Sequence, residues 1–390
     1  MLEIQDSRRY DVDWLRTLAF LLLILYHIGM YYVQDWGWHI KSEHTFAWLQ
    51  ELMILTNRWR MSLLFFISAM ALSLVVKRYS NMTLLKLRTN RLLVPLIFGM
   101  FVIVFPQVYV EAISQNLITP GVLSFWLEYI NPNTSLLRDH HSPIGLLTWN
   151  HLWFLPYLWV YSVIVILSHQ VLDRFIASIG PRIPFAVMFG LLCLALIGCW
   201  YWLAQSYPVT HALVDDWYNH SKYFLVFITG YTFARVDTWW QYVIAKRSWL
   251  LGIALLGYSF IVADRNGGFP WLAAQYEDSF AVQMLYGIFF TANHWAWIFA
   301  LIGFAGAYLT KPTPFLLYAN KAILPWYMFH QTVIIVVAWN LKEFALPAAI
   351  EFPLILGSTV LTCLIGYEIV RRTPLTRWLF GLKQQNKRGF

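Results

Sequence analysis

The stretch from Asp13 to Val33 (DWLRTLAFLLLILYHIGMYYV) constrains the fold most, because it is long and apolar enough to span a bilayer as an α-helix. Apart from tyrosines, its titratable side chains are Asp13, Arg16 and His27. A charged group inside a span costs roughly 3 kcal/mol, so it usually faces the protein interior, has a partner and serves a function. At about 100° per residue, Arg16 and His27 lie about three turns apart on one helical face, about 16 Å along the axis. The stretch therefore predicts a first transmembrane helix that carries part of a functional site.

Arg16 and His27 each have an alternative interpretation, in which the side chain has only a structural role. Arg16 could be a cytoplasmic flank of the span that extends toward the membrane surface and serves only topology. His27 could be a neutral imidazole that hydrogen-bonds a neighbouring helix. The presence of both side chains on one helical face favours a functional role for the pair.

The composition excludes an ordinary soluble domain. Hydrophobic residues make up 59% of the 390 positions and charged residues 12%, which is about half the charged fraction of a typical soluble protein. The net charge of +8 does not indicate nucleic-acid binding, because the basic residues form short runs between apolar segments, as topology signals do. Cys193, Cys199 and Cys363 lie in apolar runs without the spacing of a metal site or a disulfide framework, so we expect them in the core.

We predict an all-α fold, a polytopic integral membrane bundle of about ten transmembrane helices in a single domain over residues 1–390. Each span requires about 20 mainly apolar residues. The predicted spans are 13–33, 59–76, 92–113, 149–168, 183–204, 220–236, 248–263, 282–309, 320–340 and 353–370.

Ten spans place both termini on the same side of the membrane. Most basic residues fall on that side, including Lys387 and Arg388 in the C-terminal tail. The opposite loops contain few basic residues, namely Lys41, Arg138, Arg265 and Lys342. The positive-inside rule therefore predicts that both termini are cytoplasmic. The first apolar run lacks a small-residue cleavage site, so we expect it to remain as the first span.

Further polar residues lie in or beside the predicted spans. Arg60 opens the second span, where it needs an anionic partner or water. Arg88 and Arg91 lie three residues apart on one helical face before the third span. They could contact anionic lipids or form a basic mouth for a phosphorylated cytoplasmic substrate. His151 and His330 lie in the fourth and ninth spans, either as hydrogen-bonded structural residues or as parts of a polar cavity.

Metal binding is the competing use of the histidines. The neighbours His140 and His141, and His39 near His44, could bind zinc, but neither group has the HExxH spacing or a comparable one. We therefore predict no metal site. Glu111 lies near the end of the third span and is a candidate partner for a basic group. No GxSxG or Walker motif supports a serine hydrolase or an ATPase.

The spacing of Arg16 and His27, with ten residues between them, resembles the signature of acyltransferase family 3, in which an arginine or lysine in the first helix is followed after ten residues by a histidine. The similarity continues through WRMSLLFFISAMALSLVVKRY, the segment 88–95, NHLWFL, LPWYMFHQTV and YEIVRRTPLTRWLFG. The chain departs from the family in FFISAM, where Ala69 replaces a glycine common in relatives. We assign that glycine to helix packing, so the departure leaves the expected chemistry in place.

The resemblance implies a bundle of about ten helices in a bacterial inner membrane, with both ends cytoplasmic. It also implies an O-acyltransferase that moves an acyl group, acetyl or succinyl, from acyl-CoA in the cytoplasm to a hydroxyl of an envelope or periplasmic glycan or glycolipid. Succinylation of a periplasmic glucan is the most specific expectation. Acyl-CoA is expected as a co-substrate, with no permanently bound cofactor and no nucleic-acid partner.

Acyl transfer needs a base for the acceptor hydroxyl, a donor for the thioester oxyanion and positive charge for the coenzyme's phosphates. We expect His27 to be the general base, because histidine titrates near neutrality and the first helix can place it at mid-membrane. An acyl-imidazole intermediate is the variant that stays open. Arg16, oriented by Asp13, is expected to hold the pantetheine or phosphate portion of the donor.

The remaining candidates have supporting roles in this scheme. We expect Arg88 and Arg91 to receive the donor at the cytoplasmic mouth, and Arg60, His151 and His330 to bind the acceptor or support the oxyanion. The competing class of function is a transporter that exports a glycan or an acylated sugar, since many spans around a polar path would also serve that purpose. The sequence has no clear internal repeat to support the transporter.

Overall fold

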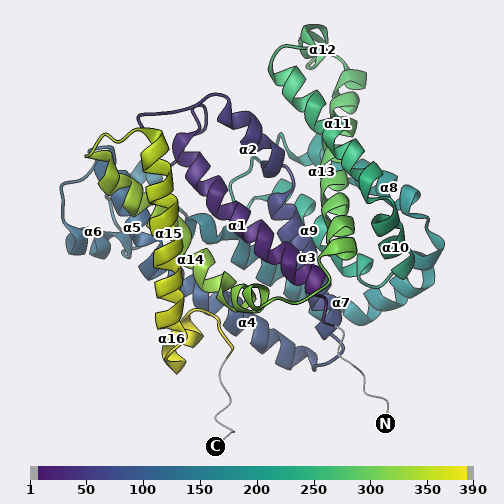
Figure 1. Cartoon of the computed structure of the whole chain (residues 1–390), viewed down its shortest axis with the longest axis horizontal. Coiled ribbons are helices and arrows are strands. Elements are labelled where there is room, and N and C mark those ends of the chain that lie inside the picture. Colours follow the sequence, from purple (N-terminus) through teal and green to yellow (C-terminus); the bar gives the residue numbers. More distant parts are fainter. Residues whose placement is uncertain (1–7, 384–390) are drawn as a thin grey trace, which may run out of the picture. The chain divides into compact units, whose positions relative to one another are not determined.

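A computed structural model describes residues 8–383, and within this range the chain is helical and contains no β-strand (Figure 1). The tail residues Lys387 and Arg388, which contributed to the predicted topology, lie outside the described residues. The α-helices are α1 (Tyr10–Tyr32), α2 (Leu49–Asn57), α3 (Arg60–Val75), α4 (Asn81–Phe98), α5 (Phe105–Ser114), α6 (Val122–Tyr129), α7 (Phe154–Ile179), α8 (Phe185–Leu203), α9 (Trp217–Phe233), α10 (Asp237–Ala245), α11 (Arg247–Arg265), α12 (Pro270–Gln275), α13 (Phe280–Tyr308), α14 (Pro314–Lys342), α15 (Ala348–Val370) and α16 (Pro374–Leu379). Short helices of other types are η1 (Gly99–Ile103), η2 (Arg138–His140), η3 (Asn150–Trp153) and η4 (Gly180–Arg182).

The protein is a polytopic helical membrane protein. Nine helical segments of the described chain are long and apolar enough to cross a membrane. The sixth predicted span, 220–236, corresponds to α9, a helix of 17 residues that is not among these nine segments. Several segments extend beyond the predicted spans, as in 81–114 and 150–182, because polar flanking residues continue the helix past the apolar core of the span.

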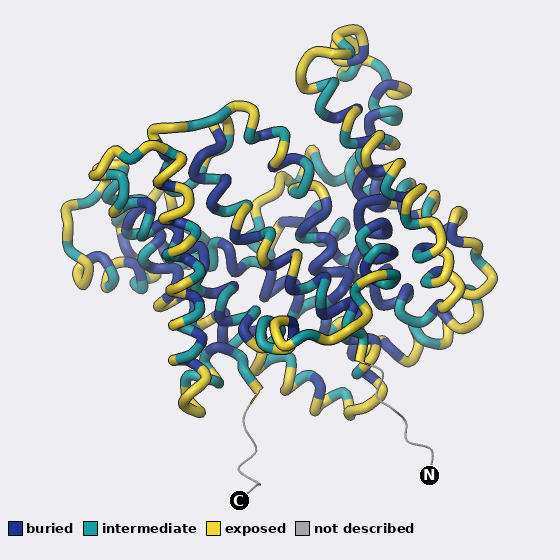
Figure 2. Tube along the Cα trace, viewed as in Figure 1, coloured by how far each residue is buried: buried dark blue, intermediate teal, exposed yellow. Residues whose placement is uncertain are grey.

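Exposed apolar side chains on the outer helices fit a membrane environment. In α8 the buried residues recur at helical spacing, as at Met188, Leu192 and Leu196. The other faces of the same helix expose Val187, Leu191 and Leu194 (Figure 2). A soluble protein rarely exposes apolar side chains over so much of one helix, whereas a lipid-facing helix does.

The chain forms two compact units. Unit 1 comprises Met1–Ala19, Ile54–Asn81 and Tyr161–Asn320, and unit 2 comprises Phe20–Met53, Met82–Val160 and Lys321–Phe390. Helices α1 and α14 contribute residues to both units. Each unit has its own buried core and is described by itself.

In unit 1, α3 packs against α9, and α11 packs against α13. Close approach of α3 and α9 depends on Gly230, because a Cβ at this position would overlap the carbonyl oxygen of Phe66. Phe66, Phe233 and Phe299 meet beside this contact, with ring centroids 5.5–5.9 Å apart. The glycine therefore lets two largely apolar helices pack backbone to backbone.

Substituting Gly230 with alanine is expected to destabilise unit 1, because the clash is with backbone atoms of α3 that cannot rotate away. Overpacking of this kind costs about 1–3 kcal/mol, or roughly 2 to 12 °C of melting temperature. Thermal unfolding of the purified protein in detergent measures the effect. The matched control is Gly252→Ala in α11, where a Cβ meets nothing within 4 Å, so its melting temperature should stay the same or rise. Equal melting temperatures for the two variants would contradict the packing argument.

In unit 2, the second half of α1 packs with α14 and α15. Their buried contact includes Ile24, Ile28, Ile334, Ile335 and Ile355, each at most 2% exposed. Branched side chains with stiff rotamers fill such a core tightly and fix the rotation of each helix. This core therefore fixes which side chains of α1 and α14 face each other in unit 2.

A π-helical turn interrupts the long segment 81–114 of unit 2. The backbone N–H of Val104 bonds the carbonyl of Gly99 at 2.8 Å, one residue farther back than in an α-helix. Pro95 lies in the preceding helix and Pro106 in the first turn of α5. The extra residue rotates the side chains that follow, and such turns occur often at functional sites. Gln107, the second residue after Phe105, is fully buried.

Candidate active site

Two histidines predicted to lie inside spans meet in unit 2. Nδ1 of His27, on α1, lies 2.7 Å from Nε2 of His330, on α14. The two rings stack with centroids 4.9 Å apart. His330 is fully buried and His27 is partly buried. The isoleucine core described above holds both helices beside this contact.

The surroundings of His330 determine which ring nitrogens carry protons. Nδ1 of His330 lies 2.8 Å from the carbonyl oxygen of Tyr327 and 3.2 Å from that of Trp326. A carbonyl oxygen only accepts, so Nδ1 of His330 must be the donor and Nε2 must carry the lone pair. His27 must therefore donate from Nδ1 to His330. In neutral His27 this leaves the lone pair on Nε2.

His151, at the start of the segment 150–182, is a third histidine of the same site. Its ring lies 5.2 Å from that of His330, nearly perpendicular to it. Its Nε2 donates to the carbonyl oxygens of Tyr327 at 3.0 Å and Met328 at 3.2 Å. The lone pair of His151 therefore lies on Nδ1. His151 and His330 share the carbonyl of Tyr327 as an acceptor.

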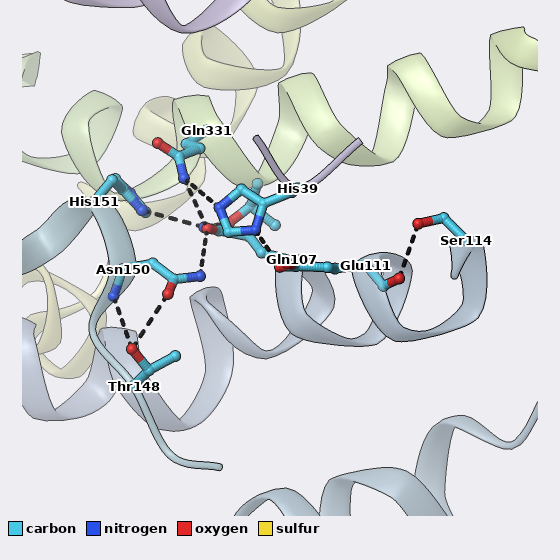
Figure 3. A network of polar contacts seen from close by, with 9 residues as sticks. His39, Gln107, Glu111, Ser114, Thr148, Asn150, His151 and Gln331 are labelled. Atoms are coloured by element: carbon cyan, nitrogen blue, oxygen red, sulfur yellow. Dashed lines mark hydrogen bonds and ion pairs between the residues drawn. The ribbon is translucent and has the colours of Figure 1, made fainter. Parts of the chain in front are cut away.

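Gln107 connects His151 to a wider polar network (Figure 3). Its Nε2 donates to Nδ1 of His151 at 3.2 Å and to the hydroxyl of Thr332 at 2.7 Å. Its Oε1 accepts from Nδ2 of Asn150 and Nε2 of Gln331, both at 3.1 Å. All four hydrogen-bonding capacities of this fully buried amide are thus used, as is expected of a buried polar group.

A histidine–carboxylate pair continues the network. Gln331 donates to Nε2 of His39 at 3.1 Å, so Nδ1 of His39 carries a proton. That nitrogen lies 2.5 Å from Oε2 of Glu111. Glu111 therefore has a partner, and that partner is a histidine of the segment 33–48, between α1 and α2. Figure 3 shows these side chains pointing toward one another from α5, α14 and that segment.

The direction of each hydrogen bond makes the four histidines chemically unequal. A second proton on His39 would place its N–H against the side-chain N–H of Gln331. In the same way, a second proton on His151 would face the N–H of Gln107. A second proton on His330 would face the N–H of His27. A second proton on Nε2 of His27 leaves its bond to His330 intact. Of the four, His27 can thus accept a proton without breaking any of these bonds, and His330 can stabilise the resulting imidazolium.

Two sets of contacts hold the segment 33–48, which carries His39, in place. The ammonium of Lys41 donates to the carbonyls of Met30 at 2.8 Å, Trp36 at 3.0 Å and Val33. It thereby caps the C-terminal end of α1, where a cation also complements the helix dipole. Burial lowers the pKa of Lys41, and nearby Asp35 partly offsets this by raising it.

The second contact is a buried carboxylate on α15. Glu351 is 4% exposed. It accepts from the hydroxyls of Tyr31 at 3.0 Å, Tyr32 at 2.9 Å and Ser42 at 3.1 Å. These charge-assisted bonds connect the end of α1, the segment 33–48 and α15. They therefore help to place His39 beside α14.

Arg16 and Asp13 lie in unit 1, at the other end of α1. Arg16 forms an ion pair with Asp13 at 3.6 Å and a long hydrogen bond to Oδ1 of Asn320, on α14, at 3.5 Å. Asp13 is closer to Arg8, at 2.7 Å. Asp13 thus contacts Arg16, as expected, but shares its charge between two arginines. Helix α1 carries Arg16 in its second turn and His27 three turns later.

The other predicted site residues are distributed over both units. Arg88 and Arg91 lie on α4 in unit 2, the first half-buried and the second exposed. Arg60 is buried in α3 of unit 1. His151 and His330 belong to unit 2, so the structure brings these two together with His27 but assigns Arg60 to a different unit.

Gln107, Gln331 and Asn150 were not predicted from the sequence as site residues. The signal available was weak, because an amide inside or beside an apolar span is unusual but needs no charge partner. His39 was considered above only as a zinc ligand. Within residues 8–383 no group of three or more His, Cys, Asp or Glu side chains is arranged to hold a metal ion.

Comparison with protein families matches residues 9–368 to the family described as an Acyltransferase domain. The match covers nearly the whole chain and includes both units. Comparisons with curated proteins and with solved structures gave no match.

Proposed function

The chain belongs to this family, acyltransferase family 3, and from that premise we propose that it moves an acyl group from cytoplasmic acyl-CoA to a hydroxyl of an envelope glycan, with His27 as the base. Membership in the family makes the protein a membrane acyltransferase. The single observation that supports the role of His27 is the 2.7 Å contact of its Nδ1 with Nε2 of His330. That contact leaves the lone pair of His27 on Nε2.

The proposed reaction is a direct transfer. Nε2 of His27 takes the proton of the acceptor hydroxyl as the hydroxyl oxygen attacks the thioester carbonyl carbon. The carbon–sulfur bond then breaks, and the departing thiolate receives the proton from the imidazolium. The products are an ester and free coenzyme A. His330 accepts from Nδ1 of His27 throughout and so stabilises the transient positive charge, a task that an aspartate performs in a Ser-His-Asp triad.

The donor is proposed to approach from the side of the termini. Arg16 lies on α1 toward that end, and Arg88 and Arg91 lie on one face of α4. Guanidinium groups suit phosphate recognition because they offer several N–H donors in a fixed fork. Both termini are proposed to be cytoplasmic, in a bacterial inner membrane, because most basic residues flank that side.

Replacing Arg91 with glutamine is expected to raise KM for acyl-CoA by about tenfold with a smaller change in kcat, because a charge-assisted phosphate contact contributes about 1.5–3 kcal/mol when it is formed. Acyl transfer kinetics with acyl-CoA and with acyl-dephospho-CoA measure the effect. Acyl-dephospho-CoA, which lacks the 3′-phosphate, should be less sensitive to the substitution. The matched control is Arg138→Gln, which removes an exposed arginine from the predicted opposite side. An unchanged KM for Arg91→Gln would remove this residue from the donor site.

The acceptor is proposed to be a periplasmic glucan and the acyl group succinyl. This proposal rests on the resemblance of DWLRTLAFLLLILYHIGMYYVQDWGWHIKS to the start of bacterial glucan biosynthesis protein C, a family member linked to succinylation of such glucans. Other relatives modify other glycans, so the acceptor has to be measured.

Mass spectrometry of periplasmic glucans and other envelope glycans tests the proposal as a whole. Three strains are compared: one with the intact gene, one with a deletion, and one with His27→Ala. The proposal predicts that one glycan loses an O-linked acyl mass in both altered strains, which would identify the acyl group and the acceptor together. Unchanged masses in every glycan would contradict a glycan acceptor.

A further inference from the structure

Unit 1 contains a basic cluster that has no part in the chemistry described above. It consists of Arg58, between α2 and α3, Lys222, on the second turn of α9, and His294, midway along α13. Arg58 is exposed, Lys222 is half-buried and His294 is 4% exposed. By the predicted topology, Arg58 and Lys222 lie toward the membrane face opposite the termini.

His294 presents a buried acceptor atom to this cluster. Its Nδ1 donates to the carbonyl oxygen of Arg58 at 2.7 Å, so the lone pair of the neutral ring lies on Nε2. Among the described residues, Nε2 of His294 has no hydrogen-bond partner. A buried polar atom of this kind usually has a hydrogen-bond partner, so Nε2 of His294 is an acceptor suited to a ligand that donates a hydrogen bond.

The cations of the cluster are not neutralised by acidic side chains. The guanidinium of Arg58 lies over the ring of Phe290, 4.7 Å from its centroid, and the ammonium of Lys222 lies 5.0 Å from the centroid of Tyr223. Neither forms an ion pair with a carboxylate anywhere in residues 8–383. The charges of Arg58 and Lys222 instead repel each other.

Other charged and polar groups nearby do not change this balance. Arg265, at the end of α11, adds like charge to Arg58. Its neighbour Asp264 accepts a hydrogen bond from the hydroxyl of Tyr286 at 2.5 Å. The hydroxyl of Tyr218, on the first turn of α9, also interacts with Arg58. The cluster therefore combines positive charge, one hydroxyl and one buried acceptor atom.

We propose that Arg58, Lys222 and His294 form a binding site for an anionic carbohydrate, in which the two cations hold a phosphate or carboxylate and Nε2 of His294 accepts from an adjacent sugar hydroxyl. The inference rests on the proposed function, because it assigns the site to the acceptor glycan and gives that glycan an acidic substituent. Charge-assisted bonds to Arg and Lys provide affinity for the anion. The histidine acceptor provides selectivity for a hydroxyl beside it, since a ligand without that hydroxyl would leave the nitrogen unpaired.

A phospholipid head group fits these residues less well. The ammonium of phosphatidylethanolamine would be repelled by Arg58 and Lys222. The phosphodiester itself has no hydroxyl to donate to His294. Phosphatidylglycerol has both an anion and hydroxyls, so it is the lipid against which the proposal has to be tested.

Binding of glucose 6-phosphate to the purified full-length protein in detergent tests the site without requiring turnover. Isothermal titration is carried out with glucose 6-phosphate, glucose, inorganic phosphate and short-chain phosphatidylglycerol. We expect glucose 6-phosphate to bind and glucose to bind at least tenfold more weakly. Arg58→Gln and Lys222→Met should each weaken glucose 6-phosphate binding about tenfold or more. His294→Phe should reduce the preference for the sugar phosphate over inorganic phosphate. Melting temperatures identify variants that fail to fold.

Arg138→Gln is the matched control, because it removes an exposed arginine of the predicted outer side that belongs to unit 2, and it should bind like the wild type. Equal affinity of wild type, Arg58→Gln and Lys222→Met for glucose 6-phosphate would overturn the proposal. Binding of phosphatidylglycerol with no binding of glucose 6-phosphate would overturn it in favour of a lipid site. Because no acyl-CoA is present, loss of binding is distinguishable from loss of acyl transfer.

Discussion

Replacing His27 with alanine is expected to lower the rate of acyl transfer by about 10²- to 10⁴-fold, which is the contribution typical of a general acid–base group. The imidazole is the one group of the histidine network that can gain a proton at Nε2 while keeping its bond to His330. Alanine removes the proton acceptor without adding a charge to the membrane. The rate is measured as release of free coenzyme A thiol from acyl-CoA by the purified protein in detergent, with a glycan acceptor present.

The matched control for this substitution is His169→Ala. His169 also lies in a membrane-spanning segment, in α7, and its Nε2 lies 3.2 Å from Oδ1 of Asn81 in unit 1. It should retain most of the wild-type rate. Both variants should have melting temperatures close to that of the wild type. Full activity of a folded His27→Ala protein would contradict the assignment of His27 as the base.

Two substitutions of His330 should distinguish the effects of its two hydrogen bonds on acyl transfer. Glutamine and asparagine each provide a group at the position of one ring nitrogen. In glutamine, Oε1 can occupy the position of Nε2 and accept from Nδ1 of His27. In asparagine, Nδ2 can occupy the position of Nδ1 and donate to the carbonyl of Tyr327, but nothing then accepts from His27. We expect His330→Asn to lower kcat by about 10²- to 10⁴-fold, as the loss of a tautomer-fixing partner does in a triad. His330→Gln should retain a much larger share of the activity.

A residue that only supports the fold would give a different result. If His330 acts through His27, KM for acyl-CoA should stay near the wild-type value in both variants while kcat differs between them. Equal rates for His330→Gln and His330→Asn would mean that the contact with His27 has no effect on transfer. A rise in KM comparable to the fall in kcat would instead indicate a role for His330 in binding, closer to the acceptor role expected from the sequence.

The helical membrane fold and the first helix could be predicted from the sequence, because length and apolarity decide which segments cross a bilayer. The functional candidates among the polar residues of that helix could also be identified from the sequence. Arg16 and His27 stand out in an apolar run because each carries a desolvation cost that needs a compensating partner. His151 and His330 were recognised for the same reason. The sequence could therefore identify which side chains need a partner in the membrane.

The identity of the partners could not be predicted. His27 and His330 are 303 positions apart in sequence, so their contact depends on how α1 packs with α14, and helical periodicity does not determine that packing. The role of Gln107 depends on the π-helical turn before it, which changes the direction of every later side chain in α5. Buried amides such as Gln107 and Gln331 have a smaller desolvation cost than charges, so they stand out less in an apolar sequence.

Which basic residues lie close together in the structure could not be predicted from the sequence either. Arg60, His151 and His330 were grouped by their shared position in spans, but Arg60 belongs to unit 1 and the two histidines to unit 2. Arg58, two positions earlier in the chain, attracted no functional prediction, because an arginine at the end of a span is usually a flank. The hydrogen bond from His294 to the carbonyl of Arg58 joins the connection between α2 and α3 to α13, 236 positions away in sequence.

The central claim is that His330 holds His27 in the tautomer with a proton on Nδ1 and a lone pair on Nε2. The most direct test is ¹⁵N NMR of the imidazole nitrogens in histidine-labelled protein in lipid nanodiscs, at a pH where His27 is neutral, with His27 assigned by comparison with His27→Gln. We predict a protonated Nδ1 and an unprotonated Nε2 for His27, and loss of that preference in His330→Asn. A protonated Nε2 with an unprotonated Nδ1 for His27 in the wild type would contradict the central claim.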